Sequence, residues 1–283
     1  MPVIVTLDVY SGQPNPTWVL DDEQAAELQR RASAAAGPRL GPLPLLGYRG
    51  FRVRPVDSER APGPRLQGLA ESIPGIGEAV IAGIRDAEEF LLTTADPHVD
   101  DELKQHVRAA IARGVDQTVL ERVRAAAAAT CPACHAADAP AYNPGFWNTP
   151  ARQPYNNCYN YANDQATNTF AQPGRATGHM YTALTCAAVQ PAATSDGLRA
   201  CPNFTATLGA GQGWYVALVI WPGRDYHWYR QDNVGCWSHK PGSTPARNTD
   251  NSGNAITDPK NCNRGPYTDF CTYMVTTRKV RIQ

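Results

Sequence analysis

The stretch from Trp214 to Lys240, WYVALVIWPGRDYHWYRQDNVGCWSHK, decides the fold of the second half of this chain. Its opening run, Trp214–Trp221, is apolar and has the length of one buried strand. The remainder predicts alternating turns and strands, with turns at 222–224 and 232–235 and strands at Tyr226–Gln231 and Cys236–Lys240. A late strand is expected at Tyr273–Ile282. The pattern therefore predicts an antiparallel sheet accompanied by short helices.

The first half has the pattern of a small α/β region. The β-branched stretch Val3–Val9 and the stretch Tyr48–Val53 predict strands, and the Ser, Gly and Pro residues of 11–16 predict a turn. Helices are expected at Asp21–Ala35, Glu78–Leu92, Leu103–Ala112 and Val115–Ala129. The Gly/Pro turn Ile73–Gly77 looks like part of a helix-hairpin-helix motif, but it stands in a net acidic region and is interpreted as an ordinary turn. The predicted fold class is α+β.

The composition of the chain changes near residue 130. Residues 1–130 carry 18 acidic and 14 basic side chains, whereas residues 131–283 carry 8 and 12. All 8 cysteines and 14 of the 15 asparagines follow residue 130. Such a change indicates two regions under different constraints. We therefore expect a small α/β region of unknown role at 1–125 and a second domain at 126–283.

Charge and hydropathy exclude two classes of partner. The 283 residues include 26 acidic and 26 basic side chains, and this balance argues against nucleic-acid binding through bulk charge. No apolar run approaches the roughly 18 residues of a membrane-spanning helix, so no membrane partner is expected. The N-terminus shows no Sec-type signal pattern. The excess of 22 arginines over 4 lysines suggests a high-GC bacterial source.

Cys158 is the candidate nucleophile. Asn156 and Asn157 precede it and can cap a helix that starts near Tyr159. A cysteine at a helix start lies near unpaired N–H groups and the positive end of the helix dipole, which lowers a thiol pKa. The same N–H groups can stabilise an oxyanion. A buried or disulfide-bonded cysteine is the alternative interpretation of this segment.

Two histidines in the hairpin are candidate partners of that thiol. Side chains alternate along a strand, so a three-residue loop at 232–234 would place His227 directly opposite His239 on one face. One imidazole could then accept the thiol proton while the other orients its ring. Packing within the sheet or binding of a metal are the alternatives for this pair.

The layout of these residues resembles the papain-like cysteine peptidases of the NlpC type. In both, a cysteine at a helix start precedes a strand histidine, and a second polar residue follows about twelve positions later. The string Cys158–Ala162 is also similar to the helix start of the related CHAP amidohydrolases. The resemblance covers residues 140–245, and Asn157 and Tyr159 replace the Asp and Ser that usually flank the nucleophile.

That resemblance implies a papain-like domain and a cysteine-dependent hydrolase or acyltransferase acting on an amide or peptide bond, with peptidoglycan peptide as the implied substrate. Cys158 would be the nucleophile, His227 the general base and His239 the orienting residue. Gln153 and Asn156 would assist the oxyanion, and Trp147 would line the substrate cleft. No cofactor is expected for this chemistry.

The other cysteines predict disulfides or a metal site. Cys131-Pro132-Ala133-Cys134-His135 has the form of a c-type haem attachment site, but a local disulfide, a redox pair or two zinc ligands are the favoured interpretations. Short loops could be closed by the pairs Cys186–Cys201 and Cys262–Cys271. Many cysteines favour an oxidising compartment and action after export, which the missing signal pattern does not support, so the localisation stays open.

Two hypotheses from other classes compete with the hydrolase. One is a non-catalytic, disulfide-stapled binding or matrix protein, which needs no free and ionised thiol at Cys158. The other is a redox or metal protein centred on the motif at 131–135. The state of Cys158 separates the first of these from the enzyme.

Overall fold

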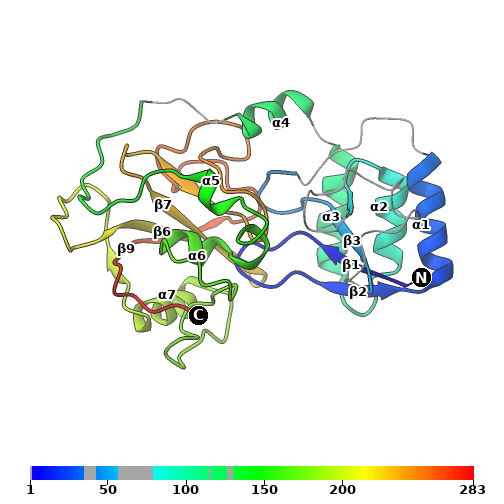
Figure 1. Ribbon diagram of the computed structural model, residues 1–283, viewed down its shortest axis with the longest axis horizontal. Helices are drawn as coiled ribbons and strands as arrows, with labels where there is room; N and C mark the ends of the chain where they lie inside the picture. The colour runs from blue at the N-terminus through cyan, green and yellow to red at the C-terminus, as the bar shows by residue number, and fades with distance from the viewer. Residues whose placement is uncertain (1, 35–42, 57–78, 115, 126–129) are drawn as a thin grey trace. The chain divides into compact units, whose positions relative to one another are not determined.

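The computed structural model describes residues 2–34, 43–56, 79–114, 116–125 and 130–283, and these residues form two compact units (Figure 1). Unit 1 consists of Met1–Val9, Asn15–Leu43 and Tyr48–Gln117. Unit 2 consists of Tyr10–Pro14, Pro44–Gly47 and Thr118–Gln283. Each unit combines helices with an antiparallel sheet, so the predicted α+β class is confirmed.

Unit 1 is built on a four-stranded sheet in the order β2-β1-β3-β4. The strands are β1 (Val3–Leu7), β2 (Thr17–Leu20), β3 (Phe51–Pro55) and β4 (Ala79–Ile81). Alternate residues of β1 and β3 are buried, which is the expected pattern for a sheet with one face on a core. The helices are α1 (Asp22–Ala34), α2 (Arg85–Thr93) and α3 (Asp101–Arg113). Asp100 caps α3 by accepting a hydrogen bond from the N–H of Leu103.

Most of the expected elements of the first half are present, with two corrections. The strand β2 follows the turn at 11–16 and was not expected, and the helix predicted from Glu78 begins only at Arg85. The residues before it form β4 because Ala79–Ile81 pairs with β3. The Ile73–Gly77 turn lies outside the described residues. The last predicted helix is α4 (Gln117–Arg124), and residues 126–129 also lie outside the described part of the chain.

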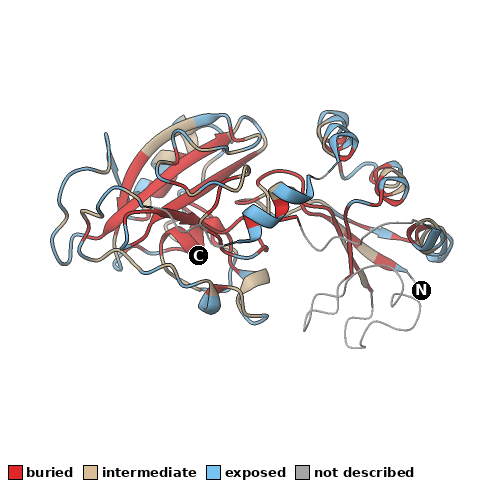
Figure 2. Ribbon diagram, turned by 90° about the horizontal axis from the view of Figure 1, so that it is seen from above, coloured by how far each residue is buried: buried red, intermediate tan, exposed pale blue. Residues whose placement is uncertain are grey.

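Unit 2 is built on a five-stranded antiparallel sheet in the order β5-β9-β6-β7-β8. The strands are β5 (Arg199–Cys201), β6 (Trp214–Trp221), β7 (Asp225–Gln231), β8 (Trp237–His239) and β9 (Asp269–Thr276). Every residue of β7 and all but the last of β6 are buried, so these two strands form the core of the unit (Figure 2). The predicted hairpin at 214–240 is therefore the centre of the sheet.

Unit 2 also contains short helices. They are α5 (Pro144–Trp147), a 3-10 turn η1 (Gln153–Tyr155), α6 (Cys158–Ala162) and α7 (Cys186–Ser195). The helix α6 contacts β7 and β8, and α7 contacts β6 and β9. None of the described helices is long and apolar enough to cross a membrane.

The last strand differs from its prediction in position. β9 begins at Asp269 rather than Tyr273 and ends at Thr276. Its pairing with β6 shifts register between Leu218 and Val219, because Cys271 has no partner across the ladder. An extra residue of this kind redirects a side chain out of the regular alternation. This redirection matters for the disulfide described below.

Candidate functional site: a buried thiol and imidazole network

Cys158 is the first residue of α6, and the expected cap is confirmed. The side chain of Asn157 accepts hydrogen bonds from the N–H groups of Tyr159 (3.0 Å) and Asn160 (3.1 Å). The side chain of Asn160 in turn accepts from the N–H of Asn157 at 3.1 Å, which completes a capping box. The asparagines therefore place the thiol at the helix start, as the sequence predicts.

The environment of the thiol is the opposite of the one expected for a nucleophile. Cys158 is fully buried, and this burial, together with the nearby charge of Asp225, raises the pKa of its thiol far above the ordinary value. A hydrogen bond from Ser11 acts in the other direction but is outweighed by burial. The predicted low pKa is wrong because desolvation penalises a thiolate more than a five-residue helix stabilises it.

The two predicted histidines do meet, although in a different register. Nε2 of His227 lies 2.7 Å from Nδ1 of His239. The residue opposite His239 is Tyr229, because the connection between β7 and β8 spans 232–236 and is two residues longer than the predicted loop. A shift of two residues in the pairing leaves each side chain on the same face of the sheet, so the two histidines lie on one side of the sheet and contact each other diagonally.

Ser11 occupies the place where a thiol–imidazole pair would form. Its Oγ lies 2.6 Å from Nδ1 of His227, and the same hydroxyl hydrogen-bonds Cys158. Both ring nitrogens of His227 are therefore engaged, one by Ser11 and the other by His239. Ser11 belongs to unit 2 although it is far upstream in the sequence. The sequence marked it only as part of a turn.

Arg247 fixes the direction of the hydrogen bonds. Its Nε donates to Nε2 of His239 at 2.9 Å, and a guanidinium always carries its protons. Nε2 of His239 therefore accepts, and its Nδ1 carries the proton and donates to His227. Burial, and then the charge of Arg247, lower the pKa of His239 well below the ordinary value, which keeps this ring neutral. Nε2 also lies 3.0 Å from the Thr249 carbonyl, but one nitrogen of a neutral ring cannot donate to Thr249 while it accepts from Arg247.

The resulting network runs in one direction. Arg247 donates to His239, His239 to His227, His227 to Ser11, and Ser11 to Cys158. Every member except Arg247 is at 0% exposure, and Arg247 is at 5%. A buried chain of hydrogen bonds of this kind rigidifies a core. The described residues leave no exposed face of Cys158 or His227 for a substrate.

Gln153 and Asn156, which were expected to assist the oxyanion, make hydrogen bonds within the chain. The carbonyls of Gln153 (2.6 Å) and Asn156 (2.5 Å) accept hydrogen bonds from Nζ of Lys240, which is fully buried. The side-chain amide of Asn156 donates to the Arg152 carbonyl and to Asn168. The side-chain amide of Asn156 is therefore engaged within the chain, and an oxyanion role for Gln153 and Asn156 stays a prediction.

Trp147 is not part of a substrate cleft. Only 1% of this residue is exposed, and its ring packs edge-on against Tyr161 at 5.2 Å between centroids. It belongs to a small buried cluster with Tyr161 and Ala246. Trp147 therefore contributes to a buried core rather than to a surface that could bind substrate.

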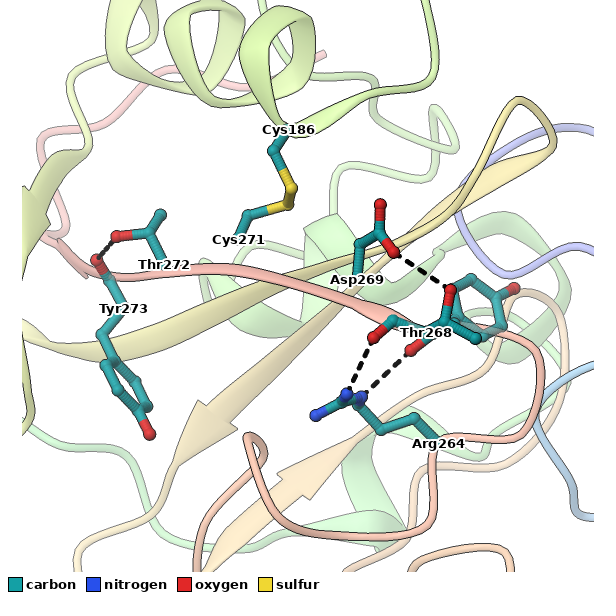
Figure 3. Close-up of a disulfide and its surroundings, with 8 residues drawn as sticks. Cys186, Arg264, Thr268, Asp269, Cys271, Thr272 and Tyr273 are labelled. Atoms are coloured by element: carbon teal, nitrogen blue, oxygen red, sulfur yellow. Dashed lines mark hydrogen bonds between the residues drawn. A yellow bond between two sulfur atoms is a disulfide. The ribbon is translucent and has the colours of Figure 1, made fainter.

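The disulfide pairs differ from those predicted by short spacing. Cys186, the first residue of α7, is bonded to Cys271 in β9 (Figure 3), with 5.3 Å between their Cα atoms. The irregularity in β9 frees Cys271 from the ladder. Cys201 and Cys262, the expected partners, carry free thiols whose pKa values burial raises to about 11 and about 12.

The Cys-x-x-Cys motif is also split. Cys131 is bonded to Cys236 with 5.1 Å between Cα atoms, and Cys134 is free. Gly235 makes this possible, because a Cβ there would lie 1.8 Å from the carbonyl oxygen of Pro132. The predicted pair Cys131–Cys134 is therefore wrong. His135 contributes its carbonyl to a backbone hydrogen bond from Leu208 at 2.7 Å. Within the described residues, no group of three or more His, Cys, Asp or Glu side chains could hold a metal ion.

Comparison with known proteins points to a different class from the predicted one. No protein-family model matches the chain, and no solved structure matches it. The chain is 48% identical over 143 residues to "Insoluble matrix shell protein 1" of Ruditapes philippinarum. The match covers 50% of this chain and 93% of that relative.

This relative corrects three predictions. The resemblance to NlpC-type and CHAP peptidases was only one of layout, and a matrix protein with 48% identity overturns it. The predicted hydrolase or acyltransferase function rested on that resemblance and is therefore also wrong. The suggested bacterial source is also wrong, since the relative comes from a mollusc. The excess of arginine over lysine therefore carried no information about the source.

Proposed function

Because this chain belongs to the family of the insoluble matrix shell protein 1 of Ruditapes philippinarum, we propose that it is a non-catalytic, disulfide-stapled component of an extracellular organic matrix. The similarity to that protein carries the proposal, since the alignment spans nearly all of the relative. Three features of the chain support it.

The first supporting feature is the buried network. A catalytic thiol needs an exposed face and a partner that removes its proton. Cys158 has neither, because it is fully buried and its neighbour is the hydroxyl of Ser11. The network instead joins the start of α6 to β7 and β8. Its role in a matrix protein is to hold the core of unit 2 in one arrangement.

The second feature is the pair of disulfides. They link residues 105 and 85 positions apart, so each one closes a long loop. Long closed loops restrict the unfolded chain strongly, and disulfides persist in oxidising surroundings outside the cell. A protein that must remain folded in a matrix without turnover benefits from both properties.

The third feature is the balance of charge. The 26 acidic and 26 basic side chains balance over the whole chain, with a net −4 on residues 1–130 and a net +4 on residues 131–283, so the molecule as a whole has no excess charge of one sign for adhesion to an ionic surface. The described residues also provide no metal cluster. Cohesion with other protein chains therefore suits this molecule better than direct attachment to a charged solid.

Sequential extraction tests the proposal. The secreted hard tissue of the source organism would be extracted with buffer, then with detergent, and finally with denaturant plus a thiol reductant, and each fraction would be probed with an antibody against unit 2. We expect the protein in the last fraction, and a soluble cytosolic protein serves as the control in the first. Recovery of the protein with that cytosolic control would refute a matrix role.

A further inference from the structure

Residues Tyr10–Pro14 are a separate segment of unit 2. They lie in the chain between β1 and β2, which belong to unit 1, yet their own contacts place them in unit 2. Ser11 and Gly12 are buried there. This short segment, Tyr10-Ser11-Gly12-Gln13-Pro14, is called the docking segment below.

The backbone of the docking segment is bound by one carboxylate. The fully buried Asp225 accepts hydrogen bonds from the N–H groups of Ser11 (2.5 Å), Gly12 (3.2 Å) and Gln13 (2.9 Å). The hydroxyl of Tyr267 donates to the same carboxylate at 2.5 Å. Three successive amides around one anion form a backbone nest. Here the peptide supplies the nest and unit 2 supplies the anion.

The opposite side of the same peptide is bound as completely. The carbonyl of Gly12 accepts from the side-chain amides of Asn157 (2.9 Å) and Gln172 (2.8 Å) and from the hydroxyl of Tyr226 (3.2 Å). These three donors come from α6's cap, a loop and β7. The peptide unit is therefore fixed by groups from separate parts of unit 2.

Side chains add specificity to this backbone recognition. A Cβ on Gly12 would lie 2.4 Å from the ring of Tyr226, so only glycine fits at that position. Ser11 hydrogen-bonds His227 at 2.6 Å, and the amide of Gln13 donates to the hydroxyl of Tyr181 at 3.1 Å. The sequence Ser-Gly-Gln is thus recognised at each of its three residues.

This arrangement has the properties of a peptide-binding site. If the site were empty, the carboxylate of Asp225 would keep its hydrogen bond from Tyr267 but lose three backbone donors, and three buried side-chain donors would each lose one acceptor. Buried polar groups that lose hydrogen bonds cost stability, so an occupant stabilises unit 2. The site does not require that the occupant come from the same copy, because every copy carries the same segment.

We propose that unit 2 contains a recognition site for a Ser-Gly-Gln turn, and that in the matrix this site is filled by the docking segment of a second copy of the chain. The proposal rests on the proposed matrix function and gives it a partner. Exchange of an identical segment loses no contact, and a head-to-tail exchange can continue from copy to copy. Within one chain, covalent attachment keeps the docking segment at a high local concentration near its site, so the intramolecular form dominates in dilute solution. In a dense matrix the docking segments of neighbouring copies are also concentrated, which favours exchange.

Photo-crosslinking between labelled chains tests this proposal. Tyr10 packs edge-on against Trp221, with 6.1 Å between ring centroids, so p-benzoylphenylalanine at position 10 would crosslink to the segment around Trp221. Unlabelled and ¹⁵N-labelled full-length chains would be mixed in equal amounts, unfolded in urea with disulfides intact, refolded at increasing concentration and irradiated. Mass spectrometry then distinguishes crosslinks within a chain from those between chains.

We expect crosslinks between light and heavy chains that increase with concentration toward about half of all crosslinks, the statistical limit for complete exchange. The same photoreactive group at Val19, which is 57% exposed, measures random collisions. An excess of the free peptide VYSGQPNP should suppress the mixed crosslinks, whereas VYSLQPNP, with leucine at the glycine position, should not. Mixed crosslinks that stay at the Val19 level at every concentration would overturn the proposal.

The outcome is separable from that of the extraction experiment. Crosslinks confined to single chains, for a protein found in the insoluble matrix, would refute the exchange and leave the matrix role intact. Mixed crosslinks in a protein recovered from the cytosol would refute the matrix role and leave the recognition site intact.

Discussion

Removing the Cys186–Cys271 disulfide should destabilise unit 2 more than removing any two free thiols. The double variant Cys186→Ala/Cys271→Ala breaks the covalent link between α7 and β9 without introducing a polar group. The link spans 85 positions and encloses β5 to β8. Its loss therefore frees the unfolded chain across the strands that form the core.

The expected magnitude follows from the length of the loop. Closure of a loop of this size stabilises a folded chain by about 4 to 5 kcal/mol in the chain-entropy description. The second disulfide, Cys131–Cys236, overlaps the same stretch and already shortens the effective loop, so the lower end of that range, about 4 kcal/mol, applies here. For a domain of this size, that corresponds to a fall in melting temperature of roughly 8 to 16 °C.

Thermal unfolding followed by circular dichroism, with urea unfolding as a second measure, would test this value. The matched control is Cys201→Ala/Cys262→Ala, which removes two half-buried free thiols and no covalent link. We expect the control to lose much less than the disulfide variant. Equal losses in the two variants would show that truncation of the side chains, and not the crosslink, determines the effect. Peptide mapping without reductant should in addition recover the 186–271 and 131–236 pairs.

Three further predictions concern buried polar groups. Cys158 should remain unalkylated by iodoacetamide at about pH 8 until the protein unfolds, because burial raises its pKa; rapid native alkylation in peptide mass spectra would contradict this. The contribution of His239 to the stability of unit 2 should be lost as the pH drops below about 6.5, since unfolded His239 binds a proton that the folded ring rejects. Burial raises the pKa of Asp225 to about 6, so this carboxyl makes the free energy of unfolding change with pH in the opposite direction between about pH 4 and 6. Comparing His239→Gln with the parent protein by urea unfolding at several pH values isolates the effect of the histidine. Its removal should reduce the pH dependence of the free energy of unfolding by up to about 1.4 kcal/mol per pH unit. Replacing Lys240 with methionine should cost about 3 to 5 kcal/mol in urea unfolding because three carbonyls lose their donor, while the exposed Lys279→Met should stay within about 0.5 kcal/mol; similar losses would refute the role of the buried ammonium.

Local pattern was sufficient for the elements that carry their own signal. The apolar run of β6, the alternation of β7 and the asparagine cap of α6 all appear where the sequence indicates them. Elements that depend on a partner were missed or displaced. β4 has only three residues and exists because it pairs with β3, and β9 is displaced around an irregularity that no local signal marks.

The sequence predicted which three side chains lie close together in the candidate site, but it did not predict the pKa of the thiol or the other residues of the network. Cys158, His227 and His239 do lie in one network, which the strand alternation and the helix cap made predictable. Ser11 and Arg247 were not predictable, since both reach the network through long-range contacts. The pKa of the thiol could not be inferred from the helix start alone, because the degree of burial decides its direction.

One glycine explains why the same residues in the same order form a core in this molecule. At Gly12 the chain passes so close to the ring of Tyr226 that no side chain could be accommodated, and this approach places Ser11 between the thiol and the imidazole. An open papain-like site would require that volume for the acyl group of a substrate. Here a segment of the chain itself occupies it, satisfies the imidazole and keeps the thiol protonated. The order of cysteine and histidines along a sequence therefore predicts proximity, whereas reactivity depends on what fills the space between them.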